Sequence, residues 1–267
     1  MKSDSTTFDP RYLQVAMLAS LLVYGLLVLD FPISGQTIVL TISTALLTQW
    51  LFTHWLKLPF FEPKSALITS FSICLLLRTD QPYLLLLAAI IAVASKFLLR
   101  YRNKHIFNPA NFSLVIITLL FDHAWFSAGQ WGDLAWFALL ICGLGLLVVI
   151  RSERADITLG FLGFYSLLVF GRALWLGDPL TIPLHQLQSG ALLIFAFFMI
   201  SDPVTSPDSR TGRLIFAACV TLGAGFTQFV LYKSNGVFYS LIIACLFTPL
   251  INIWFPGSTY QWTPRKH

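Results

Sequence analysis

Residues Ser189–Pro207 have the sequence SGALLIFAFFMISDPVTSP, an apolar run followed at once by a polar segment with two prolines. The apolar run, over 188–200, holds only 13 residues, whereas a straight helix needs roughly 20 to cross a bilayer of about 30 Å. Non-helical backbone at membrane depth is tolerated only where it is buried in protein or lines a cavity. The stretch therefore predicts a short helix that breaks inside a membrane protein.

The composition of the whole chain supports a membrane protein. Apolar residues make up 57% of the 267 residues and charged residues 11%, against about 25% charged in soluble domains. The net charge of +5 is spread over many short loops, which excludes a nucleic-acid-binding face. The four cysteines lie inside apolar runs without metal-ligand spacing, so no metal site is predicted. The expected partner is the lipid bilayer.

The hydrophobic pattern predicts an all-α, polytopic membrane protein in which residues 1–267 form one integral membrane domain. About ten spans are expected, at 12–31, 36–56, 65–78, 82–100, 112–128, 133–150, 157–176, 188–200, 214–232 and 236–255. The third and the eighth are too short to cross as straight helices. Each of these two ends in a Pro-containing polar break, over 78–82 and 201–207.

The basic residues predict the orientation of the spans. With ten spans and the N-terminus inside, 14 of the 17 Lys and Arg residues fall on the inner side and 3 on the outer side. Cytoplasmic loops carry such an excess. We therefore expect a multi-pass protein of the bacterial inner membrane with both termini in the cytoplasm.

The two halves of the chain resemble each other. Asn108–Ile116 aligns with Asn235–Ile243 at an offset of 127 residues, and Ser65 aligns with Ser189 at an offset of 124. Five spans per copy would turn the second copy upside down in the membrane. We expect inverted five-helix repeats over 12–128 and 133–255, with broken helices in matching positions pointing to a binding site.

The polar segments at the breaks supply the candidate site. Asn108 and Asp202 each precede a proline, so both are candidate N-caps of helices that begin at Pro109 and Pro203. The alternative, that these segments only turn and cap, is equally compatible with the residues. A site for an ion or a small substrate is predicted where the two breaks converge, with the side chains of Ser65, Thr69, Asn108, Asn111, Ser189, Asp202, Thr205 and Asn235.

Several of these segments resemble a known family. The sequence is similar to the membrane family that includes the RnfD component of the Rnf ferredoxin:NAD oxidoreductase and the NqrB component of the sodium-pumping NADH:quinone oxidoreductase. The specific motifs are Ser65–Thr69, Phe107–Ala110, Ser201–Ser206 and Gly212–Phe216. The resemblance implies ten spans in two inverted halves, a place in an electron-transfer complex, and flavin bound near the membrane.

The chain departs from this family at the flavin attachment. Family subunits with covalent FMN attach it to the Thr of a Ser-Gly-Ala-Thr motif in the loop between the fifth and sixth spans. That loop, about Ser127–Gly132, has no such motif, and the Ser-Gly-Ala at 189–191 is followed by Leu192. We expect no covalent flavin and leave non-covalent flavin open. The chain looks like a divergent branch, similar to homologues beside enediyne gene clusters.

Two functions remain. In the first, the chain is a non-catalytic membrane subunit of an Rnf/Nqr-like electron transport complex, coupling redox chemistry to ion transport together with other subunits. In the second, it is a stand-alone transporter or channel for a small solute that uses the inverted-repeat site. The resemblance favours the first function, and the missing flavin attachment favours the second.

Overall fold

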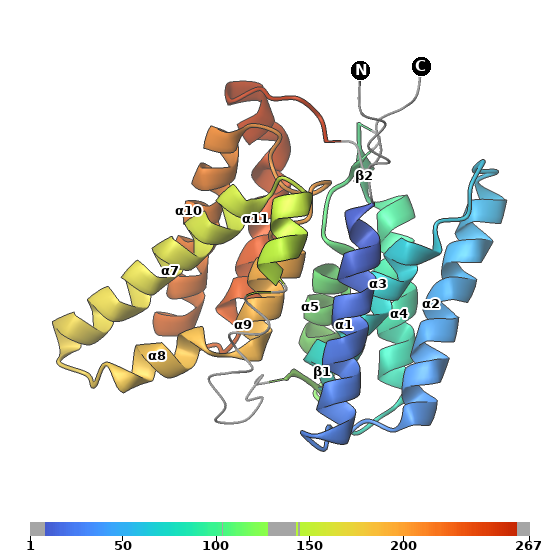
Figure 1. The fold of residues 1–267 in the computed structure, drawn as a ribbon, viewed down its shortest axis with the longest axis horizontal. Helices are drawn as coiled ribbons and strands as arrows, with labels where there is room; N and C mark the ends of the chain where they lie inside the picture. The colour runs from blue at the N-terminus through green and yellow to red at the C-terminus, as the bar shows by residue number, and fades with distance from the viewer. Residues whose placement is uncertain (1–8, 103, 128–142, 144, 261–267) are drawn as a thin grey trace, which may run out of the picture.

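The computed structural model describes residues 9–102, 104–127, 143 and 145–260. The described part is largely helical, with two short two-stranded ribbons (Figure 1). The helices are α1 Pro10–Leu27, α2 Gly35–Trp55, α3 Pro63–Leu76, α4 Tyr83–Leu98, α5 Pro109–Leu120, α7 Ala155–Leu176, α8 Thr181–Leu187, α9 Gly190–Ile194, the π-helix η1 Phe195–Met199, α10 Arg210–Phe229 and α11 Gly236–Trp254. The strands are β1 Leu77–Thr79, β2 Arg100–Tyr101, β3 Lys104–His105 and β4 Ala124–Phe126.

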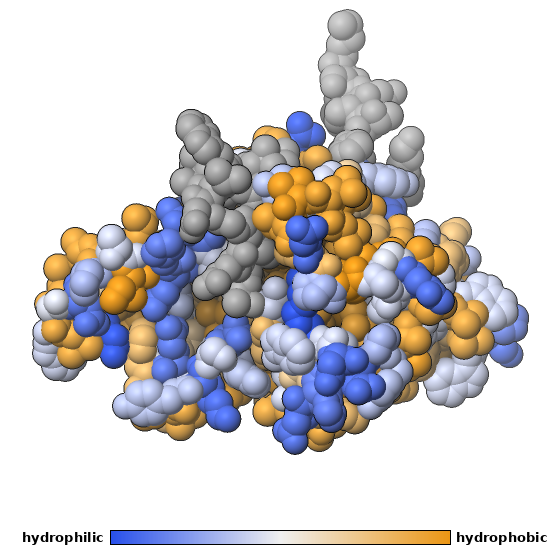
Figure 2. All heavy atoms as spheres, turned by 90° about the horizontal axis from the view of Figure 1, so that it is seen from below, coloured by the Kyte–Doolittle hydropathy of each residue, from blue (hydrophilic) through white to orange (hydrophobic). Residues whose placement is uncertain are grey.

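Many large apolar side chains are exposed on the surface of this fold, as expected of a protein in contact with lipid. Large apolar side chains point outward, among them Leu167 (74% exposed) and Trp175 (88% exposed), while hydroxyl groups such as those of Thr41 and Thr158 are fully buried. Small polar residues between helices and apolar residues outside are typical of membrane helix packing. Figure 2 shows hydrophobic side chains interspersed with hydrophilic ones at the end of the molecule seen there.

The lengths of the helices confirm an all-α, multi-pass membrane protein. Within the described residues, α1, α7, α10 and α11 are each long and apolar enough to cross a bilayer, and α8 with the α9–η1 segment forms a further, bent pair with an angle of 48°. The helices α3, α4 and α5 are apolar but shorter. Most of the sixth predicted span, 133–150, lies outside the described residues.

The first residues of the helices follow the capping rules. Asn108 accepts a hydrogen bond from the backbone N–H of Asn111 at 3.1 Å, and Pro109 occupies the first turn of α5. This confirms the prediction for Asn108. Ser209 caps α10 in the same way through the N–H of Gly212, at 3.1 Å. A side-chain oxygen at such a position satisfies one of the N–H groups that an α-helix leaves unpaired at its start.

The predicted fifth span, 112–128, is wrong at its end. The helix α5 stops at Leu120, and Ala124–Phe126 forms strand β4, which pairs antiparallel with β1 at the end of α3. The physical reason is that the backbone beyond α3 leaves its helix while still buried in the protein, at Leu77 and Arg78, and must find other hydrogen-bond partners there. The pairing of Leu77 with Phe126 and of Thr79 with Ala124 supplies them.

The short helices form the centre of the fold. Figure 1 shows α1 to α5 grouped on one side and α7 to α11 on the other. The helix α3 packs against α1, α2, α4 and α5, and α5 contacts α11 across the two groups. All residues of α9 and η1 are buried. Broken helices at the centre match the requirement that interrupted backbone be shielded from lipid.

The π-helix η1 ends three residues before Asp202. Its hydrogen bond runs from the N–H of Ile200 to the carbonyl of Phe195, five residues back, at 3.0 Å. The carbonyl of Ala196 accepts a further hydrogen bond from the Thr158 hydroxyl of α7 at 2.8 Å. Single π turns are rare and frequently lie at functional sites.

Candidate functional site

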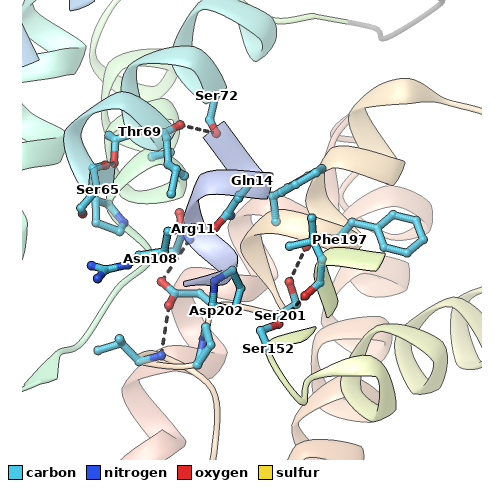
Figure 3. Close-up of a pocket in the computed structure, with 18 of the residues that line it drawn as sticks. Arg11, Gln14, Ser65, Thr69, Ser72, Asn108, Ser152, Phe197, Ser201 and Asp202 are labelled. Atoms are coloured by element: carbon cyan, nitrogen blue, oxygen red, sulfur yellow. Dashed lines mark hydrogen bonds between the residues drawn. The ribbon is translucent and has the colours of Figure 1, made fainter. Parts of the chain in front are cut away.

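A cavity of about 90 Å³ lies where the broken helices meet the first turns of α1 and α5. This volume is enough for several water molecules or a small solute. Figure 3 shows polar side chains from both groups of helices pointing into it. The polar lining from the first half includes Arg11, Gln14, Ser65, Thr69, Ser72 and Asn108, and from the second half Ser152, Ser201 and Asp202. Phe197 and Phe198 form an apolar wall.

Asp202 carries the acidic group of this cavity. Its Oδ2 accepts a hydrogen bond from Nδ2 of Asn108 at 3.3 Å and lies 3.6 Å from Nε2 of His105. The side chain is 14% exposed. No Lys or Arg in the described ranges lies within ion-pair distance of Asp202. A carboxylate inside a membrane protein that has a histidine beside it and no Lys or Arg partner in the described ranges is a strong functional candidate.

The prediction that Asp202 caps a helix is wrong. Its Oδ1 accepts a hydrogen bond from the N–H of Val204 at 3.0 Å, and no helix begins at Pro203, because α10 starts only at Arg210. An Asp side chain that bonds the backbone two residues on stabilises a turn rather than a helix. The second oxygen of Asp202 is therefore directed at Asn108 and the cavity.

Asn108 joins the two halves of the site. Its carbonyl oxygen caps α5, which leaves the amide group to donate to Asp202. The capping bond fixes the rotamer of Asn108. The start of α5 thus holds the carboxylate of the other half in place.

Lys96 approaches the same cavity from behind Ser65. The Nζ group donates to Oε1 of Gln49 at 2.6 Å and to the Ser65 hydroxyl at 3.1 Å. Gln49 is itself buried, with 3% exposure. From the sequence, Lys96 could equally have reached toward the membrane surface, yet its ammonium group turns inward. Ser65 therefore connects a basic side chain to the cavity.

A cluster of ion pairs lies beside the cavity, around Asp9 and Arg11 at the start of α1. Arg11 binds Asp9 at 2.8 Å and Glu62 at 3.0 Å, and Lys64 binds Asp9 at 2.7 Å. Burial on its own raises the pKa of Asp9, but hydrogen bonds from Arg11 and Lys64 outweigh it and hold the pKa at about 2. The positive charge of Arg11 is thereby balanced outside the cavity.

The eight predicted site residues fall into two groups. Ser65, Thr69, Asn108 and Asp202 line the cavity together. The other four are placed elsewhere: Asn111 donates to the carbonyl of Phe238 at 3.0 Å, Thr205 is buried beside Thr248, and Ser189 and Asn235 precede α9 and α11. Ser189 lies at the opposite end of the α9–η1 segment from Asp202, so the two cannot meet at one site.

The sequence interpretation missed the contribution of α1. Arg11 and Gln14 are three residues apart, so they share one face of the helix, and both line the cavity. Two polar residues on one face at the start of an apolar helix were a detectable signal. Ser201 stands at the start of the Ser201–Ser206 motif but was not chosen as a site residue, and Ser152 had no comparable signal, because isolated serines are common in membrane proteins.

Comparison with known proteins gives the family. The model of the NQR2, RnfD, RnfE family matches residues 116–261, more than half of the chain. The chain belongs to this family. The matched region contains Asp202, α10 and α11, whereas Arg11, Ser65 and Asn108 precede it.

Curated relatives agree with this assignment. The chain is 34% identical over 131 residues to a protein from Escherichia coli O81 (strain ED1a) that is named as the D component of an ion-translocating oxidoreductase complex, covering 49% of this chain and 36% of that protein. A protein of the same name from Shigella boydii serotype 18 is 35% identical over 133 residues, with the same coverage. The chain thus covers about a third of the length of these relatives.

Proposed function

We propose that this family member is a non-catalytic membrane subunit of an Rnf/Nqr-like electron transport complex that couples redox chemistry to ion transport. The observation that carries the proposal is Asp202, a carboxylate in the family-matched region that lines a cavity between the two groups of helices. The relatives named as subunits of an ion-translocating oxidoreductase complex support the same function.

The chemistry of the cavity suits a small cation or a polar solute. Asp202 accepts a hydrogen bond from the neutral Asn108 amide and lies 3.6 Å from His105, while hydroxyl groups of Ser65 and Thr69 line the same space. Hydroxyl and carboxylate oxygens are ligands that hard cations prefer. Placing a carboxylate in this position costs free energy unless a cation or a proton shares the site.

The finer architecture belongs to the proposal as well. We infer ten spans in two inverted repeats, over 12–128 and 133–255, with both termini on the cytoplasmic side of the bacterial inner membrane. The contact of Asn111 with Phe238 supports this arrangement. The two residues are separated by 127 positions, the offset that aligns Asn108 with Asn235, so equivalent positions of the two copies touch each other.

Cofactor and partners follow from the same reasoning. We propose that the chain holds no covalent flavin, since Leu192 follows the Ser-Gly-Ala at 189–191 and offers no hydroxyl group for a phosphoester. Most of the loop that would carry the flavin in the family, Ser127–Gly132, lies outside the described residues. Non-covalent flavin stays compatible with the proposal, and other complex subunits are the expected partners.

The second candidate function is a stand-alone transporter or channel for a small solute. It is favoured by one observation: both groups of helices in this chain line the cavity, with residues of α1, α3, α5, η1 and the segment after it.

One experiment separates the two functions. The protein is purified in mild detergent from its own membranes, and the co-purifying chains and the flavin absorption spectrum are recorded. A redox complex predicts stoichiometric oxidoreductase subunits, and no fluorescent flavin band on this chain in a denaturing gel. Isolation of the chain alone would contradict the complex and favour the transporter, and a flavin band that survives the gel would contradict the absence of covalent flavin.

The variant Asp202→Asn tests the site in the same preparation. It keeps the size of the side chain and removes the charge. We expect normal membrane insertion and a loss of ion-transport activity of at least tenfold, with Ser209→Ala, which removes only a helix cap, as the control. Full activity of Asp202→Asn would mean that the carboxylate merely stabilises its turn.

A further inference from the structure

Arg154 is a buried cation with an unused hydrogen-bonding edge. It directly precedes α7 and is 4% exposed. Its Nη1 donates to the carbonyl of Glu153 at 3.3 Å. Its Nε and Nη2 have no hydrogen-bond partner among the described residues and no contact with solvent. Buried polar groups without a partner are rare in proteins and call for an explanation, such as a bound ion.

The neighbouring Arg213 shows which partner such an edge takes. Its Nε donates to both carboxylate oxygens of Asp156 at 2.9 Å, and its Nη2 donates to the same group. The two N–H groups on this side of a guanidinium point in parallel, so they match two oxygens of one carboxylate or phosphate. Arg154, two residues before Asp156, presents the same pair of donors and lacks the matching oxygens.

The nearby acids are already engaged. Asp156 is bound by Arg213, and Asp208 is bound by Lys104 at 2.8 Å and by Nδ2 of Asn252 at 3.3 Å. Burial lowers the pKa of Arg154, and the charge of Arg213 lowers it further. A buried charge without a partner is strongly unfavourable. An added anion at this edge would remove that cost.

The place of Arg154 indicates what kind of anion reaches it. The long apolar helix α7 begins at the next residue, Ala155, so Arg154 stands at the boundary of the bilayer, the level of the lipid phosphates. The ring of Tyr260 covers the guanidinium at 5.0 Å. The chain before Tyr260 is fixed at Gly257, where an added Cβ would lie 2.6 Å from the backbone N of Ser209. An incoming group would contact the Tyr260 ring, which lies over the guanidinium.

We propose that Arg154 forms a binding site for a phosphate group, which its Nε and Nη2 hold side-on and the Tyr260 ring covers when the site is empty. The position at the bilayer boundary favours the phosphate of a phospholipid headgroup. Inorganic phosphate offers the same chemistry from solution. The site is separate from the Asp202 cavity and does not depend on the proposed function.

Native mass spectrometry of the purified, delipidated protein tests this site. The probes are phosphatidic acid, diacylglycerol with the same acyl chains, and inorganic phosphate. We expect the wild-type protein to bind phosphatidic acid but not diacylglycerol, and Arg154→Gln to lose about tenfold or more of that affinity. The matched control is Arg151→Gln, which removes the same charge from an exposed position three residues earlier and should change the affinity less than twofold.

Two further measurements complete the test. Arg154→Lys keeps the charge but loses the paired donors, so it should bind phosphatidic acid as weakly as Arg154→Gln, and its unchanged melting temperature without lipid would show that it folds. Inorganic phosphate that binds wild type as tightly as phosphatidic acid would support the site and assign it to a free phosphate. Equal lipid affinity in Arg154→Gln and Arg151→Gln, or full retention in Arg154→Lys, would overturn the proposal.

Discussion

At the residue scale, Asp9 stands out because one carboxylate ties two helices together. It accepts the backbone N–H of Arg11 at 3.0 Å as the cap of α1, and it binds Lys64 at the start of α3. The side chain is 8% exposed. The deprotonated form is therefore the one that the fold stabilises.

The pH dependence of stability follows from the lowered pKa of Asp9. Because the folded-state pKa lies near 2 and the ordinary value is 3.8, the stabilisation is complete above about pH 4 and is lost as the pH falls toward 2. We expect Asp9→Asn to cost about 1 kcal/mol at pH 6, after allowance for solvent screening, and almost nothing near pH 2. Thermal melting in detergent at both pH values measures this. Asp30→Asn, at an exposed position, is the control, and a cost for Asp9→Asn that does not change with pH would contradict the mechanism.

Single residues were predicted well where the deciding interactions are local. The pattern Asn108-Pro109 predicted a helix start, and the capping bond to Asn111 is present. The same pattern at Asp202-Pro203 led to a wrong helix start. Pro207 explains the difference, since it disfavours helical geometry at the residue before it and removes a backbone N–H that a helix would use. The segment after Asp202 therefore forms turns, and the Asp202 carboxylate faces the cavity.

At the element scale, the contact between α5 and α11 joins the two groups of helices. Asn111 is 1% exposed and donates from α5 to the carbonyl of Phe238 in the first turn of α11. A side-chain hydrogen bond between helices is worth more when both partners are shielded from water. This one bond fixes how two half-buried helix starts meet.

Removal of this bond should weaken the association of the two groups. We expect Asn111→Leu to destabilise the protein by about 1–3 kcal/mol, because it leaves a buried carbonyl with one partner fewer. Urea unfolding in mixed micelles, followed by tryptophan fluorescence, measures the change. Thr118→Val in the same helix is the control, since the Thr118 hydroxyl bonds only carbonyls of α5 itself, at 2.8 and 3.2 Å. Equal stability of the two variants would contradict a role of Asn111 between the helices.

Helices were predictable from the sequence, and the short strands were not. The apolar runs predicted α3 and the α9–η1 segment as short, buried elements, because length against bilayer thickness decides them. Strand β4 spans only Ala124–Phe126 inside an apolar run, and three residues carry no period that separates a strand from a helix. Its existence depends on its partner β1, which lies more than 40 residues earlier in the chain.

At the scale of the whole molecule, the two ends of the helices carry different charges. Lys104 of β3 bonds Asp208, so the loops around 101–111 and 201–213 lie at one end, as the basic residues of the sequence predicted. Asp80 lies at the other end of α4, a helix of 16 residues and therefore about 24 Å long. Figure 1 shows β2 and β1 at opposite ends of the molecule.

The sidedness of the protein can be measured by cysteine labelling. In a background without the four native cysteines, Arg102→Cys and Asp80→Cys are treated with a membrane-impermeant maleimide on intact cells. We expect Asp80→Cys to react and Arg102→Cys to react only after permeabilisation, because the orientation that we propose places the basic end in the cytoplasm. Arg151→Cys should behave like Arg102→Cys. Reaction of Asp80→Cys and Arg102→Cys from the same side would contradict the orientation.

Half of the predicted site residues line the cavity, and the inverted arrangement that we propose accounts for the rest. An upside-down second copy carries equivalent positions far from the midplane to opposite ends of the protein, whereas equivalent positions near the midplane, such as Asn111 and Phe238, can touch. Ser65 and Ser189 align in sequence, yet only Ser65 lines the cavity, together with Asp202, with which it does not align. Sequence alignment indicates which residues are equivalent, but only the fold determines which ones meet.

The π turn at η1 changes the direction, around the helix axis, in which the side chains after it point. Successive residues of an α-helix advance by about 100°, so a turn that closes one residue later rotates everything beyond it by roughly that angle. Before the turn, Leu193 and Ile194 face packed neighbours; after it, Ser201 and Asp202 face the cavity. One short segment can thus pack apolar side chains against the protein interior and present a carboxylate to the cavity. The single extra residue in the π turn sets the angle between these two sets of side chains.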